Sequence, residues 1–192
     1  MNGRIRKQVE EYAGLKLNRC ADYLMDFLKE LYGVDGAVVE FGVYRGATLA
    51  TMALWMKLNG DNSDLIGLDT FCGYPGLEKF SDTSIEEVRA LFAVLGLGHP
   101  NLLVGDFAVE GKLLPPKIKL AFLDCDLYDS YLSALNCCYP KMVKGGIIVM
   151  DEYYSLKYPG ARVAADEFFS DKPEKPEIYA VDDGWERWYV RF

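Results

Sequence analysis

The chain has 192 residues, of which 51% are hydrophobic and 26% are charged, and its formal net charge is −8. This length is enough for one domain with a sizeable hydrophobic core. The acidic balance argues against a nucleic acid or an anionic membrane as partner, because either would favour a basic protein face.

The N-terminus and the cysteines indicate a reducing, intracellular compartment. The first residues are followed by charged rather than apolar ones, so a secretory signal peptide is not expected. No apolar stretch approaches the ~20 residues that a membrane-spanning helix needs. Five cysteines are scattered without a C-x-x-C pair, which argues against a zinc site. We therefore expect a cytoplasmic protein with no membrane association.

Hydrophobic periodicity and turn residues predict alternating helices and strands. In chain order these are a helix over 18–32, a strand over 37–42, a helix over 46–58, a strand over 65–69, a helix over 84–95, strands over 101–104 and 118–123, a helix over 129–142, a strand over 146–150, a helix over 160–170, and strands over 177–182 and 186–191. Asn18 is expected to cap the first helix, and Thr83 with Glu86 predicts a capping box for the third.

The alternation of strands and helices predicts an α/β fold with a parallel sheet covered on both faces. Asp183-Gly184 is a hairpin signal, so the last two strands should add an antiparallel edge. No linker or repeat divides the chain, which predicts a single domain over 1–192. Residues 1–36 are expected to form an N-terminal helical cap near the substrate.

The segment 38–48 carries the spacing E-x-G-x-x-x-G between the first predicted strand and the next helix. Gly42 and Gly46 lack a Cβ, so backbone N–H groups can approach a bound ligand there. The spacing differs from the G-x-G-x-x-G of dinucleotide-binding folds. It resembles the segment with which S-adenosylmethionine (SAM) methyltransferases bind the methionine end of their cofactor. The expected contacts in this segment are Glu40, Gly42, Tyr44, Gly46 and Thr48.

Acidic residues also stand at the ends of the later strands, at the sheet edge where α/β proteins bind ligands. Asp69 is suited to accept hydrogen bonds from the ribose 2′- and 3′-hydroxyls, with a turn or cap role as the alternative. Asp106 could accept a hydrogen bond from an adenine amine, and Phe107 could stack on the ring. Phe71, just after Asp69, is assigned to the same cofactor site.

Asp124 and Asp151 end the fourth and fifth predicted strands. Adjacent parallel strands lie about 4.8 Å apart, so if these two strands are neighbours, their terminal carboxylates can share one cation. Asp126 or Glu152 could supply a third oxygen. An all-oxygen donor set suits Mg²⁺ rather than Zn²⁺. The alternative is that the acids cap helices or bind water.

Together these segments resemble the macrocin/mycinamicin-type (TylF-like) sugar O-methyltransferases, which belong to the class I SAM-dependent methyltransferases. The resemblance runs from about residue 37 to 170 and rests on 40–46, on Asp-Thr-Phe-Cys-Gly-Tyr-Pro at 69–75, on Asp-Cys-Asp-Leu-Tyr at 124–128 and on Asp-Glu-Tyr at 151–153. It implies a three-layer Rossmann-like class I methyltransferase fold with a mostly parallel, seven-stranded sheet.

The resemblance also implies a Mg²⁺-dependent transfer of a methyl group to a hydroxyl of a deoxysugar in a natural product. The family's metal carboxylates map onto Asp124, Asp151 and Glu152, the last standing where aspartate is common. A cation bound to the acceptor hydroxyl lowers its pKa. We assign Asp126 as the proton acceptor and Asp124 as the second catalytic residue. The region 1–36 is short for this family, so the resemblance does not identify the acceptor.

Several alternatives stay open at this point. A catechol-like acceptor would also chelate the ion through two adjacent hydroxyls. A NAD-dependent oxidoreductase is disfavoured by the glycine spacing, and a non-catalytic SAM-binding protein by the complete set of acids. The oligomeric state is undetermined, with a homodimer as one alternative.

Overall fold

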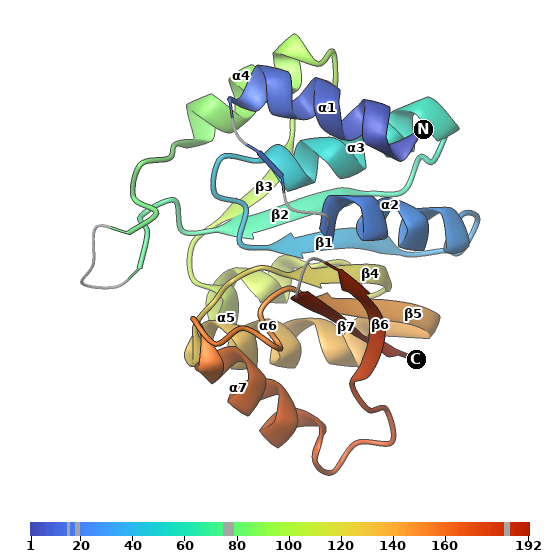
Figure 1. The fold of residues 1–192 in the computed structure, drawn as a ribbon, viewed down its shortest axis with the longest axis vertical. Coiled ribbons are helices and arrows are strands. Elements are labelled where there is room, and N and C mark those ends of the chain that lie inside the picture. The colour runs from blue at the N-terminus through green and yellow to red at the C-terminus, as the bar shows by residue number, and fades with distance from the viewer. Residues whose placement is uncertain (15, 18–19, 75–78, 183–184) are drawn as a thin grey trace.

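The computed structural model describes residues 1–14, 16–17, 20–74, 79–182 and 185–192. These residues form a seven-stranded sheet in the order β3-β2-β1-β4-β5-β7-β6. Helices α1 to α4 cover one face of the sheet, and α5 to α7 cover the other (Figure 1). The predicted three-layer Rossmann-like α/β fold is therefore confirmed.

The strands and helices alternate through most of the chain, and helices precede the first strand. The strands are β1 Ala37–Phe41, β2 Leu65–Asp69, β3 Asn101–Val104, β4 Ile118–Leu123, β5 Met142–Met150, β6 Glu177–Asp182 and β7 Trp185–Arg191. The helices are α1 Asn2–Ala13, α2 Cys20–Glu30, α3 Ala47–Asn59, α4 Ile85–Val94, α5 Phe107–Glu110, α6 Tyr128–Cys138 and α7 Pro159–Phe169, with short 3₁₀ helices η1 Gly111–Leu113 and η2 Tyr139–Lys141.

The central strands β1 and β4 are buried along their whole length, as their almost uninterrupted apolar sequences predict. They pair in parallel with Phe41 opposite Leu123, and β4 pairs in parallel with β5, with Leu123 opposite Met150. The carboxyl ends of β1, β4 and β5 therefore meet at one edge of the sheet. The residues that follow these strands are brought together there.

Two apolar clusters, one on each face, hold the layers together. The first packs side chains of α1 to α4 on residues such as Val38, Leu120 and Val149. The second packs α6 and α7 on residues such as Val39 and Ile148. Because successive strand residues point to opposite faces, β1 and β5 contribute to both clusters.

Two predicted boundaries are wrong: the end of the helix over 129–142 and the start of the strand over 146–150. The helix predicted over 129–142 ends at Cys138, because Pro140 falls in the 3₁₀ turn η2 and β5 already begins at Met142. A proline inside a helix lacks the N–H that the ladder needs, which favours this early end. The short helix α5 after β3 and the helix α1 were not among the individually predicted elements.

The predicted capping box is displaced by one residue. Ser84 is the N-cap of α4, its side chain accepts a hydrogen bond from Glu87 N at 3.2 Å, and Glu87 Oε2 accepts one from Ser84 N at 3.1 Å. Thr83 instead donates to the backbone carbonyl of Tyr44 at 2.6 Å. Thr83-x-x-Glu86 and Ser84-x-x-Glu87 both match the capping-box pattern. The contact of Thr83 with Tyr44 is consistent with Ser84, rather than Thr83, acting as the N-cap.

Two predicted local features, the Asn18 cap and the Asp183-Gly184 turn, lie outside the described residues. Within the described part of the chain, no helix combines the length and apolar character that crossing a bilayer requires.

Candidate cofactor and metal site

A cavity of about 590 Å³ opens at the carboxyl ends of the central strands. Nine of the predicted site residues line it, and they come from the ends of β1 to β4 and the start of α3: Glu40, Gly42, Tyr44, Thr48, Asp69, Asp106, Phe107, Asp124 and Asp126. Four do not line it: Gly46 packs against Val88, Phe71 packs against the core of the α1–α4 face, and Asp151 and Glu152 lie beside the cavity next to Asp124. Lys16 and Leu17 also line the cavity, so the N-terminal region reaches the site.

Glu40 is a buried carboxylic acid at the end of β1, only 1% exposed. Burial raises its pKa well above the ordinary glutamate value, and the negative charges of Asp124 and Asp69 add to this effect. Its Oε2 atom has no hydrogen-bond partner among the described residues. A buried acceptor without a partner is costly, so this atom suits a ligand that brings a positively charged donor.

Gly42 is required by the packing of the strand ends. A Cβ at this position would lie 1.8 Å from the backbone oxygen of Asp124, and the residue has φ +90°. At Gly46 (φ +76°) a Cβ would meet the side chain of Val88 on α4 at 2.7 Å. In this structure, the two glycines of the motif permit close packing within the protein.

Asp69 organises the loops around the cavity. Its Oδ2 accepts hydrogen bonds from the backbone N–H groups of Val43 and Tyr44, both at 2.8 Å, and its Oδ1 accepts one from Phe71 N at 2.8 Å. A carboxylate offers about four lone-pair positions. Asp69 can therefore hold the turn and still accept a hydrogen bond from a ribose hydroxyl. Few of its lone-pair positions remain free for a ligand.

Asp106 and Phe107 lie at the start of α5. Asp106 is the N-cap of this helix and accepts a hydrogen bond from Ala108 N at 2.8 Å. Phe107 is 9% exposed and packs edge-to-face against Phe41, with ring centroids 5.3 Å apart. Both residues line the cavity, although much of the Phe107 ring belongs to the core.

Asp124, Asp151 and Glu152 form an acidic cluster at the ends of β4 and β5, and each offers an oxygen atom within 4.8 Å of the other two. Tyr131 on α6 donates a hydrogen bond to Glu152 Oε2 at 2.8 Å and accepts one from Glu152 N at 3.1 Å. Burial, followed by charge repulsion within the cluster, raises the pKa of Asp124 and of Glu152. This donor set fits a hard divalent cation, which would relieve the repulsion.

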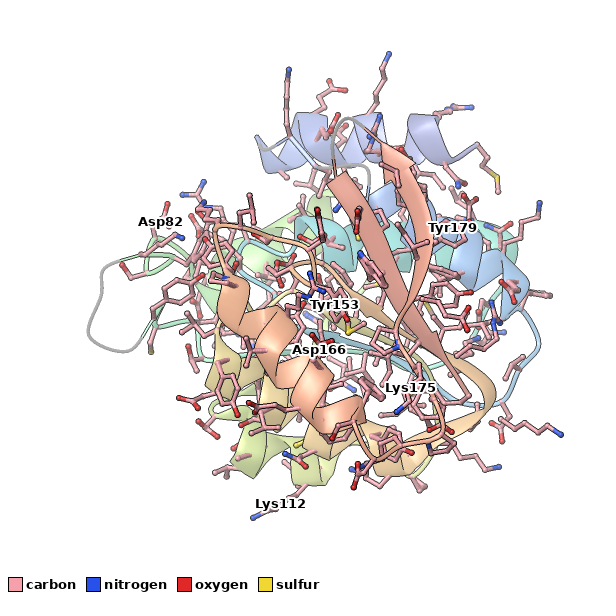
Figure 2. All side chains as sticks on the ribbon, turned by 60° about the horizontal axis from the view of Figure 1, so that its bottom comes forward. Asp82, Lys112, Tyr153, Asp166, Lys175 and Tyr179 are labelled. Carbon is pink, nitrogen blue, oxygen red and sulfur yellow. The ribbon has the colours of Figure 1, made fainter. Side chains whose placement is uncertain are left out.

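The loop after Glu152 is anchored to α7. Tyr153 donates a hydrogen bond to the carboxylate of Asp166, and Figure 2 shows these two residues close together. The ring of Tyr153 also packs on Trp188 of β7, with centroids 4.7 Å apart. These contacts fix the backbone that follows the acidic cluster.

Asp126 lies in a strained turn at the cavity. It is 9% exposed and has φ +59°, a backbone conformation that residues other than glycine adopt rarely. Tyr74 donates a hydrogen bond to its Oδ2 atom. Burial raises the pKa of Asp126, and the Tyr74 hydrogen bond and the charge of Lys79 oppose that shift in part.

The motifs in the sequence did not single out Tyr74, which lines the cavity, or Lys79 and Tyr158, which lie beside it. Lys79 contacts the Tyr158 hydroxyl and lies 4.4 Å from the centroid of that ring. It also lies 4.8 Å from the ring centroid of Phe80, which lines the cavity with Tyr74. The only sequence signal was for Tyr74, which stands within the Asp-Thr-Phe-x-Gly-x-Pro segment at 69–75.

Arg187 of β7 was also missed. Its Nη1 atom lies 3.1 Å from Oδ1 of Asp151, in the acidic cluster. Nothing near Arg187 in the sequence marks it, because the contact depends on how β7 pairs with β5.

The sequence of this chain is similar to those of two curated O-methyltransferases. It is 31% identical over 141 residues to the 8-demethyl-8-(2,3-dimethoxy-alpha-L-rhamnosyl)-tetracenomycin-C 4′-O-methyltransferase of Streptomyces olivaceus, a match that covers 63% of this chain. It is 24% identical over 172 residues to the mycinamicin III 3″-O-methyltransferase of Micromonospora griseorubida, covering 78% of this chain. The chain spans 54% and 66% of the lengths of these two relatives.

The fold is also that of a solved methyltransferase. The structure of the O-methyltransferase NovP superposes with a TM-score of 0.79 at 24% identity, covering 90% of this chain and 79% of NovP. The family model for macrocin-O-methyltransferase (TylF) matches residues 16–190, nearly the whole chain. The resemblance stated from the motifs is therefore confirmed, and the chain belongs to the macrocin-O-methyltransferase (TylF) family.

Proposed function

We propose that this protein is a SAM-dependent and Mg²⁺-dependent O-methyltransferase that methylates a hydroxyl of a sugar or sugar-containing natural product in the cytoplasm. The observation that carries the proposal is the convergence of Asp124, Asp151 and Glu152 beside a cavity of about 590 Å³. A metal site next to a cofactor-sized cavity would help to orient a weakly acidic hydroxyl and to lower its pKa for methyl transfer.

SAM is the proposed methyl donor. Glu40 supports this assignment, because its unpartnered Oε2 atom would accept a hydrogen bond from the ammonium of the methionine end. Asp69, Asp106 and Phe107 are proposed to bind the adenosine end, since all three line the same cavity. Gly42 and Gly46 shape the turn, while Tyr44 and Thr48 line its cavity side.

Asp124, Asp151 and Glu152 are the proposed ligands of Mg²⁺. When bound, this cation would lower the pKa of the acceptor hydroxyl and help to orient it. The raised pKa values of Asp124 and Glu152 support the assignment, because a cluster of acids that repel one another gains most from a cation.

Asp126 is the proposed proton acceptor. It lines the cavity two residues after Asp124, and its pKa is raised by burial toward the range in which a carboxylate acts as a base. The hydrogen bond from Tyr74 would hold its carboxylate in one orientation. Strained backbone at Asp126 is also a common property of functional residues.

A sugar acceptor is proposed because one curated relative is named as a 4′-O-methyltransferase of a rhamnosyl-bearing tetracenomycin, and another as a 3″-O-methyltransferase of mycinamicin III. Tyr74 and Phe80 would offer the flat, partly apolar surfaces on which sugar rings pack. Catechols are included in the test, because transfer to a catechol would change the proposed acceptor but not the type of reaction.

The test is a methyl-transfer assay with labelled SAM against a panel of glycosylated natural products, nucleotide-linked deoxysugars and catechols. We expect transfer to a sugar hydroxyl that stops with EDTA and returns with Mg²⁺. Asp126→Asn should lower the rate by about 100-fold or more while leaving SAM affinity within a few-fold, since general-base catalysis is worth that much. Full activity in EDTA would refute the metal requirement, and transfer to catechols alone would refute the sugar acceptor.

A further inference from the structure

Arg187 is a buried cation in contact with the acidic cluster. Its side chain is 6% exposed, and its Nη1 atom lies 3.1 Å from Asp151 Oδ1. In the antiparallel ladder of β5 and β7, Met150 pairs with Trp188. The residue before Trp188 therefore lies beside the residue after Met150, and residues paired in this way point to the same face of the sheet. The strand register itself places Arg187 next to Asp151.

The burial of Arg187 makes this contact important for both partners. An arginine stays charged at all ordinary pH values, and burying its charge is costly unless it is compensated. Asp151 supplies a charged partner, whereas Nε of Arg187 is buried without a partner among the described residues. Asp151 also accepts a hydrogen bond from the thiol of Cys20 on α2. Asp151 is thus held from two elements, β7 and α2.

The two neighbouring acids are held in comparable ways. Tyr131 fixes Glu152 through two hydrogen bonds, and Arg187 contacts Asp151 from the neighbouring strand β7. In metal centres, mutating a residue that orients a ligand typically lowers the metal affinity by about 10- to 100-fold. Arg187 occupies the place of such an orienting residue.

The charges also balance. When ionised, the three carboxylates of the cluster carry three negative charges, and Arg187 offsets one of them. The remaining two match one divalent cation. Asp126, two residues after Asp124, is near the positive charges of Lys79 and Lys157, and it also repels the carboxylates of the cluster.

We propose that Arg187 is a positioning residue of the metal site: it holds the carboxylate of Asp151 in the orientation that a divalent cation requires. This inference rests on the proposed function, because it needs a cation at the acidic cluster. It adds a residue from the C-terminal hairpin to a site otherwise built from β4 and β5.

The test is the Mg²⁺ affinity of Arg187→Met, measured by isothermal titration of Mg²⁺ into the protein without SAM. If Arg187 acted through its charge alone, removing it would relieve repulsion of the cation and tighten Mg²⁺ binding. Loss of orientation predicts the opposite, a weakening of about 10- to 100-fold. Arg187→Lys keeps the charge but loses the planar fork, so it should also bind Mg²⁺ more weakly than the wild type.

The matched control is Arg191→Met, on the same strand. Arg191 pairs with Glu30 at 2.6 Å on the surface, away from the acidic cluster, and its loss should leave Mg²⁺ affinity unchanged. SAM affinity, measured for each variant, reports whether the fold and the cofactor site are intact. Should Arg187→Met fail to fold, Arg187→Lys carries the test.

The outcomes separate the two levels of the proposal. Wild-type Mg²⁺ binding together with unchanged or tighter binding in Arg187→Met, or in Arg187→Lys if that variant alone folds, would overturn the role of Arg187 and leave the proposed function standing. Absence of Mg²⁺ binding in the wild type would overturn the metal dependence, and the role of Arg187 with it.

Discussion

Asp151 shows how one residue can serve two partners. It is a proposed metal ligand, and it is also the charged partner of the buried Arg187. Replacing Asp151 alone would leave the arginine buried without this compensation, which is more damaging than losing both charges together. A loss of activity in Asp151→Ala would therefore mix catalysis with stability. The double variant Asp151→Asn/Arg187→Met is the better background for judging the metal ligand.

Gly42 is a position at which both the backbone conformation and the packing require glycine. Gly42→Ala would combine unfavourable backbone at φ +90° with a collision against Asp124 O. We expect a loss of about 3 kcal/mol or more in the free energy of unfolding, measured by urea denaturation.

Gly33→Ala is the matched control for that prediction. Gly33 has a similar φ of +83°, but a Cβ there would meet nothing within 4 Å. It should lose only about 1 kcal/mol, the backbone contribution by itself. Equal losses in the two variants would show that the approach of Gly42 to Asp124 is not what requires glycine.

At the scale of elements, β4 has important polar residues near both of its ends. Its carboxyl end leads into Asp124, and near its start Lys119 forms a buried ion pair with Asp61, with Nζ 2.8 Å from Oδ2. Both side chains are almost inaccessible, at 0% and 5% exposure. The pair connects β4 to the segment after α3, and it lies at the opposite end of the strand from the cavity.

Lys119→Met should destabilise the protein without touching the site. It leaves Asp61 buried without its cation, which costs about 3–5 kcal/mol in comparable proteins. Lys119→Met/Asp61→Asn should recover part of that loss in thermal or urea unfolding.

Lys117→Met provides the comparison for Lys119. Lys117 pairs with Asp35 at 2.6 Å, but both side chains are exposed, so we expect a change of about 0–1 kcal/mol. A cost for Lys119→Met as small as that of Lys117→Met would contradict the role of the buried pair.

At the scale of the whole molecule, stability and pH are linked through buried acids that act in opposite directions. Burial raises the pKa of Glu40, so the folded protein binds this proton more tightly than the unfolded chain. Its contribution to stability is present below the ordinary carboxyl pKa of about 4 and is lost as pH rises toward the raised value. For Asp61, burial acts against ionisation, but hydrogen bonds from Lys119 and Ser63 outweigh it and lower the pKa. That contribution is lost as pH falls.

We therefore predict that Glu40→Gln changes the pH dependence of stability. The variant keeps the shape of the side chain without a titrating group, so its free energy of unfolding should decline less than that of the wild type between pH 5 and 8. Thermal unfolding in 0.5 M salt would suppress the contribution of the net charge of −8 and leave the buried group visible. An unchanged slope would show that Glu40 does not bind its proton more tightly in the folded state.

The sequence determined much of the fold because its signals are local. Uninterrupted apolar runs marked β1 and β4, alternation with helices implied a parallel sheet, and the acids after each strand marked the edge where the cavity lies. Predicting that Asp124 and Asp151 meet required only that β4 and β5 be neighbours, which the structure has. The helix end near Pro140 was misjudged because the periodic pattern continues past the residue that breaks the ladder.

The tertiary structure decided what depends on contacts between distant segments. Arg187 lies 36 residues from Asp151, and only the register of β7 on β5 brings them together. The position of Tyr74 beside Asp126, the hydrogen bonds of Asp69 to the β1 loop, and the unpartnered oxygen of Glu40 are set in the same way. The hydrophobic pattern of a chain fixes which faces are buried, but the partners of a polar side chain are chosen by packing, and packing is a property of the assembled layers.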